Sequence, residues 1–167
     1  MIQQATQKDA HAAASLALLL WPNHTLEEFT EEMTQLLKEE NAAIFLAYDD
    51  DRAVGFAQCQ LRTDYVEGTD SSPVGYLEGL FVREEYRQQG CARQLVEQCE
   101  QWAKLRGCLE FASDCEWDNE ESLRVHLQLG FTEANRIICF TKKIIKMANK
   151  KITGVANNST CDFSTFF

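Results

Sequence analysis

The chain has 167 residues, a length typical of one compact domain or of one domain with a tail. Apolar residues make up 45% and charged residues 25%, ordinary globular values that exclude a mainly disordered chain. No apolar run approaches the roughly 20 residues of a membrane-spanning helix. The first ten residues lack the basic and then apolar segments of a secretory signal. We therefore expect a globular cytoplasmic protein without a membrane segment.

The net charge of −10 narrows the kinds of partner. Nucleic acid is disfavoured, because a phosphate backbone needs a basic surface. An acidic surface can attract cations or polyamines over a distance, and it can equally serve only solubility. Charge alone leaves both interpretations open.

The seven cysteines are odd in number and include no C-x-x-C pair, and the three histidines show no H-x-x-x-H spacing. Because a zinc site needs closer ligand spacing, we expect no bound metal. Reduced thiols are the expectation for a cytoplasmic protein. Cys59, Cys99 and Cys139 lie in apolar patterns, which predicts that they are small core residues.

Two capping boxes predict the starts of the first two helices. Each has a hydroxyl residue three positions before a carboxylate, Thr6 with Asp9 and Thr25 with Glu28. The segment Trp21-Pro22 ends the first helix, because a residue before proline avoids helical angles. In chain order we expect a strand, two helices and a β-hairpin, at residues 2–5, 10–20, 26–37, 43–48 and 53–62.

A third long strand is expected over residues 74–82. Glu78-Gly79 interrupts its apolar character, and a glycine inside a strand suggests a bulge or a close backbone approach. A charged loop follows, and then a helix, a short buried strand, a helix capped by Asp118 or Asn119, and a last strand, at residues 92–106, 109–114, 119–130 and 136–143. This order predicts an α/β domain with a mixed sheet.

Residues 144–167 change in character, with lysines, asparagines and serines in no clear period. We predict a domain over residues 1–143 and an extension over 144–167 outside it. The alternative is an added helix over 144–151 that packs on the domain.

The most informative segment is 80–92, where a strand leads through a loop into a helix. The loop ends in the run RQQGCA, from Arg87 to Ala92. A helix start presents free N–H groups and the positive end of its dipole, which together favour an anion. Gly90 would let the main chain approach a pyrophosphate, and Arg87 adds a cation. The glycine spacings of Walker and Rossmann loops are absent.

This loop resembles the acetyl-coenzyme A motif of the GNAT superfamily of N-acetyltransferases. The run from Asn119 through His126 to Gly130-Phe131 resembles the next motif of that superfamily. More closely, four further segments resemble aminoglycoside 6'-N-acetyltransferases, at residues 20–22, 65–69, 77–82 and 110–114. The resemblance covers about residues 1–143 and implies the GNAT fold, an α/β domain with a mixed, mostly antiparallel central sheet flanked by helices.

The resemblance implies direct transfer of acetyl from acetyl-coenzyme A to the 6'-amine of an aminoglycoside, and hence antibiotic resistance. Direct transfer needs a neutral amine, so a base must take its proton. Glu78 is the candidate base, or else a strand residue paired with an arginine. Asp114 is the candidate second carboxylate that holds drug ammonium groups, or else a helix cap. Trp21 and Tyr65 resemble the walls of the drug pocket, although core packing explains Trp21 almost as well.

The implied coenzyme contacts are the main chain of Leu80, Phe81 and Val82 for the pantetheine arm, the loop of Arg87, Gln88, Gln89, Gly90, Cys91 and Ala92 for the pyrophosphate, and Asn119 beyond the thioester. A main-chain N–H of this strand would also stabilise the oxyanion.

His126 departs from the superfamily, many of whose members have a tyrosine there that is assigned to protonate the leaving thiolate. Histidine can donate a proton near neutral pH, or His126 can be an ordinary helix residue. Cys91 lies near a helix N-terminus, which favours a thiolate, but we expect a bystander rather than a covalent nucleophile.

Two other kinds of function stay open. One is a GNAT enzyme that acetylates another polyamine or a protein amine, and the other is a non-catalytic acyl-coenzyme A binding domain. The resemblance also suggests a homodimer.

Overall fold

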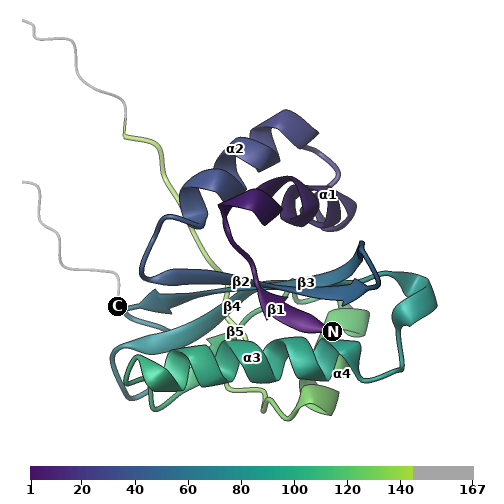
Figure 1. Cartoon of the computed structure of the whole chain (residues 1–167). Coiled ribbons are helices and arrows are strands. Elements are labelled where there is room, and N and C mark those ends of the chain that lie inside the picture. Colours follow the sequence, from purple (N-terminus) through teal and green to yellow (C-terminus); the bar gives the residue numbers. More distant parts are fainter. Residues whose placement is uncertain (145–167) are drawn as a thin grey trace, which may run out of the picture. The chain divides into compact units, whose positions relative to one another are not determined.

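The computed structural model describes residues 1–144 and contains one five-stranded sheet. Its strands are β1 (Ile2–Gln4), β2 (Ala42–Asp49), β3 (Arg52–Arg62), β4 (Val74–Val82) and β5 (Phe111–Ser113). They follow one another in sequence order across the sheet. Each neighbouring pair from β1 to β4 is antiparallel, whereas β5 joins β4 in parallel. The predicted mixed, mostly antiparallel sheet is confirmed (Figure 1).

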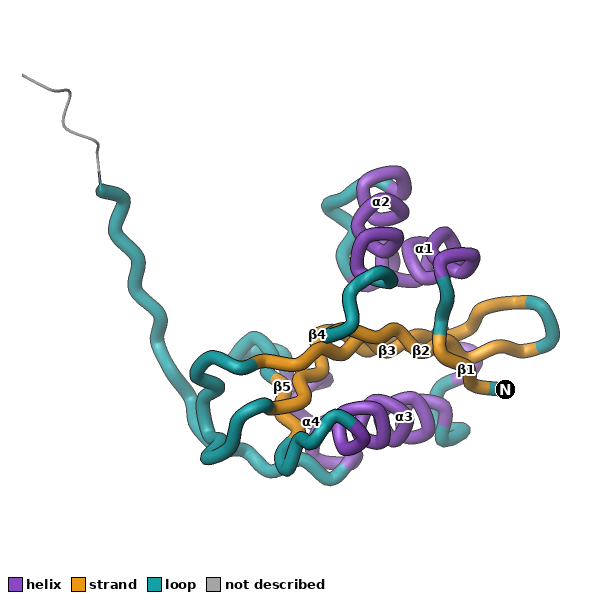
Figure 2. Tube along the Cα trace, turned by 60° about the vertical axis from the view of Figure 1, so that its left-hand side comes forward, coloured by secondary structure: helices purple, strands orange, loops and turns teal. Residues whose placement is uncertain are grey.

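Helices cover both faces of the sheet. They are α1 (Ala10–Leu20), α2 (Leu26–Leu36), α3 (Cys91–Leu105) and α4 (Glu120–Leu129), with short 3-10 turns at Gln7–Asp9 and Glu84–Tyr86. Figures 1 and 2 show α1 and α2 on one face and α3 on the other. Alternation along β3 builds two cores, because Phe56 packs in the cluster of α1 and α2, whereas Ala57 and Cys59 pack in the cluster of α3.

Both capping boxes form as predicted. The Asp9 carboxylate accepts hydrogen bonds from the main-chain N–H and the hydroxyl of Thr6. The bond from the Thr6 N–H is the main reason that the pKa of Asp9 lies below its usual value. Thr25 and Glu28 make the reciprocal pair at the start of α2.

The predicted irregularity in β4 is a β-bulge. Gln58 of β3 stands opposite Gly79, but Cys59 stands opposite Leu77, so Glu78 is an extra residue in β4. Another residue also lies close to the backbone of Gly79, as a glycine within a strand suggested. A Cβ on this glycine would lie 2.6 Å from Cη2 of Trp21, so the indole occupies the space of the absent side chain.

The predicted strand over residues 136–143 is wrong, because no strand or helix follows α4 in the described part of the chain. The continuous apolar run from Ile137 to Phe140 suits a buried strand, but a strand also needs a partner edge for its main-chain groups. Cys139 is consequently exposed rather than a core residue, whereas Cys59 and Cys99 are fully buried as predicted. The strand predicted at 109–114 is shorter and only half-buried.

Apart from Ile144, the predicted extension and the alternative helix over 144–151 lie outside the described residues. None of the described helices combines the length and apolar character that crossing a membrane requires.

Candidate active site

A cavity of about 280 Å³ lies between the α1–α2 layer and the sheet. Aromatic and polar side chains share its wall, namely Trp21, His24, Phe29, Glu32, Gln58 and Glu78. Two of these six residues are carboxylates, so the cavity suits a ligand with positive charge and an apolar body.

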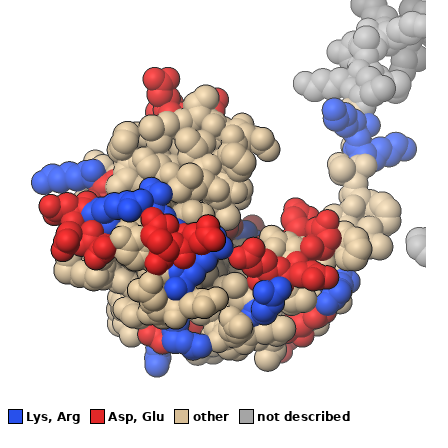
Figure 3. Space-filling model, turned by 90° about the vertical axis from the view of Figure 1, so that its right-hand side faces the viewer, with Lys and Arg blue, Asp and Glu red and all other residues tan. Residues whose placement is uncertain are grey.

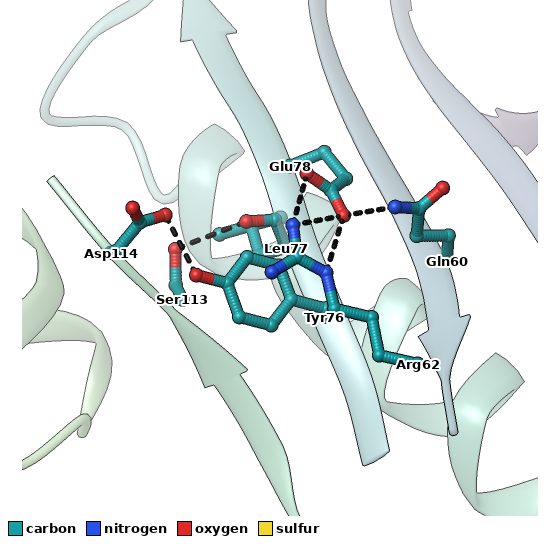
Figure 4. A network of polar contacts seen from close by, with 7 residues as sticks. All are labelled: Gln60, Arg62, Tyr76, Leu77, Glu78, Ser113 and Asp114. Carbon is teal, nitrogen blue, oxygen red and sulfur yellow. Dashed lines mark hydrogen bonds and ion pairs between the residues drawn. The ribbon is translucent and has the colours of Figure 1, made fainter. Parts of the chain in front are cut away.

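Glu78 points from the bulge of β4 into a set of donors on β3 (Figure 4). Its Oε1 accepts from Nε2 of Gln60 and from Nε and Nη2 of Arg62, at 3.1 and 2.8 Å for the two arginine nitrogens. Its Oε2 accepts from Nη2 of Arg62 at 2.9 Å. The predicted alternative, pairing with an arginine, is therefore present. This pairing holds the carboxylate in one orientation at the cavity wall and does not exclude a role as base.

Asp114 is joined to the same network through a tyrosine (Figure 4). The Tyr76 hydroxyl donates to Asp114 Oδ1 at 2.7 Å, and the guanidinium of Arg62 stacks 3.4 Å from the centre of the Tyr76 ring. Burial, followed by the bond to Asp114, raises the pKa of Tyr76 above its usual value, so the phenol stays a donor. Asp114 does not cap α4, because that cap is Asn119. The two candidate carboxylates thus belong to one connected set.

His126 lies on α4 and contacts β5. Its Nδ1 lies 2.8 Å from the carbonyl oxygen of Ser122, which can only accept, so Nδ1 carries a proton. Its Nε2 lies 2.9 Å from Oγ of Ser113, the residue next to Asp114. His126 therefore ties α4 to the end of β5, directly before Asp114.

The two predicted pocket aromatics have different surroundings. Trp21 lines the cavity and packs against Phe29 and Phe56, with ring centres 6.0 and 6.2 Å apart. Its predicted roles as pocket wall and as packing residue are thus compatible. Tyr65 is 81% exposed in the loop before β4, and its hydroxyl donates to Glu67 of the same loop. The structure does not bring Tyr65 to the wall of this cavity.

The edge of β4 is open where the coenzyme arm is predicted to lie. Within residues 1–144, β5 pairs with β4 only from Gly75 to Leu77. From Glu78 to Val82 no strand among residues 1–144 pairs with that edge, although the Val82 carbonyl accepts from the side chain of Arg87. This stretch includes Leu80 and Phe81, and it can pair with another extended chain. A pantetheine arm with its two amides fits such an edge.

The loop before α3 has the features of an anion site. Gly90 is the N-cap of α3 with φ +82°, and Gln88 also has positive φ at 59°. No side chain caps the helix, so its first N–H groups are available to a ligand. The space beside Gly90 is open, since the nearest atom to a Cβ built there would be Nε2 of Gln94 at 3.8 Å. Arg87 donates to the Val82 carbonyl at 3.1 Å and pairs with Glu121 of α4 at 3.3 Å. These features fit the pyrophosphate of coenzyme A.

The remaining predicted coenzyme residues have structural contacts of their own. Gln89 donates to the carbonyl of Glu85, and Cys91 and Ala92 begin α3 beneath the loop. Burial raises the pKa of the Cys91 thiol, which agrees with a bystander rather than a nucleophile. The Asn119 side chain accepts from the N–H of Ser122 as the cap of α4, which leaves its amide N–H groups for a ligand.

Sequence reasoning missed Gln58, Gln60 and Arg62, which we call the polar row. They alternate along β3 with residues of the α3 core, so they share the face that α1 and α2 cover. The available signal was this alternation, Q-C-Q-L-R, in a strand otherwise apolar on both faces.

These features define an α/β protein with an acidic cavity beside an open strand edge and a helix-start anion site. The sequence model of the acetyltransferase (GNAT) family matches residues 11–131. An aminoglycoside N(6')-acetyltransferase type 1 from Acinetobacter genomosp. 13 is 45% identical over 130 residues, which are 77% of this chain and 88% of that relative.

Solved structures agree with the sequence match. AAC(6')-Ih from Acinetobacter baumannii, an aminoglycoside 6'-N-acetyltransferase, is 41% identical with a TM-score of 0.83, over 86% of this chain and 98% of that one. AAC(6')-Iy in complex with coenzyme A is 38% identical with a TM-score of 0.83, over 86% of this chain and 95% of that one. The chain therefore belongs to the GNAT acetyltransferase family.

Proposed function

We propose that the protein is an aminoglycoside 6'-N-acetyltransferase that confers resistance, moving acetyl from acetyl-coenzyme A directly to the 6'-amine. The observation that carries this proposal is the cavity of Glu32, Glu78 and Trp21 beside the open edge of β4. Aminoglycosides carry several ammonium groups on sugar rings, which such a wall of carboxylates and aromatic rings can bind. The relatives of similar length bear the same activity in their names.

Each proposed role follows from a position in the structure. When bound, acetyl-coenzyme A supplies an acetyl thioester with a thiolate as its leaving group. Glu78, held by Gln60 and Arg62, takes a proton from the substrate ammonium directly or through one water. Asp114 holds a second ammonium group. The β4 edge and the loop from Arg87 to Ala92 hold the coenzyme, with Asn119 beyond the thioester.

Proton return to the thiolate is the proposed role of His126. In this role the ring would hold a proton on Nε2 as well as on Nδ1, and the Nε2 proton would pass through the hydroxyl of Ser113, which lies 2.9 Å from Nε2. Tyr65 is proposed as a drug contact from the exposed loop before β4, where it is free to meet the outer rings of a bound drug.

The test is thiol release from acetyl-coenzyme A with tobramycin, compared with a matched compound that has a 6'-hydroxyl. We expect release with the amine and none with the hydroxyl. The Glu78→Gln variant keeps the shape of the side chain and should lose about 10²–10⁴-fold in kcat, the usual contribution of a general base. Turnover of polyamines or peptide amines but not of aminoglycosides would favour another acceptor. Coenzyme binding without any turnover would favour a binding domain.

We also propose a cytoplasmic homodimer with no nucleic-acid or membrane partner. Cys59 and Cys99 are buried free thiols, as is usual in a reducing compartment. Figure 3 shows acidic and basic side chains interspersed on one face rather than a continuous basic surface. Ile138 and Phe140 are exposed and offer apolar area to a second copy. Light scattering coupled to size exclusion would test the dimer.

We further propose residues 1–143 as the acetyltransferase domain and 144–167 as an extension. The match to the family model, over residues 11–131, lies wholly within the proposed domain.

A further inference from the structure

Gln58 is the first residue of the polar row, and its amide oxygen is buried without a hydrogen-bond partner among the described residues. Gln58 is 8% exposed and lines the cavity together with Glu78 and Trp21. Its Oε1 is one of two buried side-chain polar atoms without a hydrogen-bond partner among the described residues, the other being Nε1 of Trp102. Trp102 belongs to the α3 core, whereas Gln58 stands at the wall of a cavity.

A buried amide oxygen without a partner is unfavourable, because it has lost its bonds to water and gained none in return. Met or Leu would fill the same space without this penalty. The other members of the polar row have no such penalty, since Gln60 and Arg62 both donate to Glu78. A partner that arrives with a ligand explains why a polar residue occupies position 58.

The acceptors at this wall can be counted. Oε1 of Glu78 accepts from Gln60 and twice from Arg62, so its lone pairs are in use. Oε2 of Glu78 accepts only from Nη2 of Arg62, so one of its lone pairs can still accept a hydrogen bond. Gln58 Oε1 is the other acceptor that remains, and a half-turn of the amide can direct it to an incoming group. The wall thus presents two acceptors with free capacity.

We propose that Gln58 binds the acceptor amine of the substrate. The ammonium first passes its third proton through water to Glu78 and on to solvent, which leaves the carboxylate ionised again; the amine that is about to react then has two N–H donors and one lone pair. Glu78 Oε2 and Gln58 Oε1 each accept one N–H, which leaves the lone pair directed at the thioester. A hydroxyl has a single donor and would leave one acceptor unpaired, so Gln58 also selects amines over hydroxyls. This inference rests on the proposed function, because it names the group that the cavity holds.

The test is Gln58→Met, which keeps length and removes the amide, with Gln58→Leu as a second variant. We expect kcat/KM for tobramycin to fall about 10- to 100-fold, the usual effect of losing one hydrogen bond to a charged group or its transition state. The wild-type preference for binding the 6'-amine over the 6'-hydroxyl compound should shrink about 10-fold. The melting temperature should stay or rise, because an unpaired buried polar group is gone. Gln101→Met, on the exposed face of α3, is the matched control and should change none of these.

The outcomes separate the two proposals. Wild-type protein that turns over no aminoglycoside would overturn the proposed function and this inference together. Active wild type with an unchanged preference in Gln58→Met would overturn only the inference. A Gln58→Met variant that loses stability in step with activity would also overturn it, since the amide would then be serving the fold.

Discussion

Replacing Gly79 with Ala tests the contact between the bulge and the cavity wall. A new Cβ would lie 2.6 Å from Cη2 and 3.2 Å from Cζ2 of Trp21. Carbon atoms in contact are normally about 3.5–4.0 Å apart, so the indole must retreat by about 1 Å. Phe29 and Phe56 pack against the same ring and limit its retreat. The backbone angles of Gly79 suit any residue, so the effect is steric alone.

Overpacking of this kind costs about 1–3 kcal/mol. For a domain of this size, that lowers the melting temperature by about 2–12 °C. The KM for the aminoglycoside should rise as well, because Trp21 lines the cavity. Thermal unfolding and steady-state kinetics measure the two effects.

The Gly79→Ala, Trp21→Phe double variant supplies the control for this prediction. A smaller ring removes the clash, so the double variant should be more stable than the sum of the two single changes predicts. A Gly79→Ala variant that melts within about 1 °C of wild type with an unchanged KM would show that the new Cβ meets no clash. Simple additivity of the two substitutions would likewise show that Gly79 and Trp21 do not interact.

Two further predictions concern the coenzyme loop and the first capping box. Gly90→Ala places an L-residue at φ +82°, a strain of about 1–2 kcal/mol, and should raise the KM for acetyl-coenzyme A; a rise confined to the aminoglycoside KM would contradict the assignment of this loop. Asp9 has a folded pKa below the unfolded value of 3.8, so its stabilising contribution is complete above that value and disappears as pH falls through the lower folded pKa. Asp9→Asn should therefore lower the melting temperature at neutral pH more than at about pH 3, and an equal loss at both would show that the carboxylate charge is not responsible.

The features that the sequence predicted correctly have short-range causes. A capping box is complete within four residues. The bulge at Glu78-Gly79 is indicated by a charged residue and a glycine inside an apolar strand. The loop from Arg87 to Gly90 likewise needs only its own residues and the start of α3 to bind an anion. In each case the physical reason and the residues lie in one short segment.

The side-chain network depends on strand pairing, which no short segment determines. Arg62 meets Glu78 because β3 and β4 pair in one particular register with one extra residue. Tyr76 meets Asp114 because β5 joins β4 in parallel. The polar row was visible as alternation, but polar alternation usually indicates a solvent-facing side. Only the position of α1 and α2 makes Gln58 of this row part of a cavity wall.

The wrong prediction of a strand at 136–143 also has a long-range cause. The apolar run from Ile137 to Phe140 is like that of a buried strand, but a sequence pattern does not show whether the sheet has an edge left for it to pair with. Edges are a property of the assembled sheet, and β5 has only three residues. Ile138 and Phe140 are therefore exposed in spite of a correct local pattern.

The bulge explains how the candidate base and the coenzyme edge come to adjoin. Before it, Leu77 packs in the α3 cluster; after it, Phe81 packs with α1 and α2 while Val82 returns to the α3 cluster. The extra residue therefore reverses which face of the sheet odd- and even-numbered side chains point to. The apolar residues before and after the bulge can thus all pack in a core, while Glu78 points into the cavity wall. Pairing with β5 also ends at Leu77, directly before the bulge. The carboxylate for the amine and the open edge for the acetyl carrier thus begin at the same residue, which is the arrangement that direct transfer between two bound molecules requires.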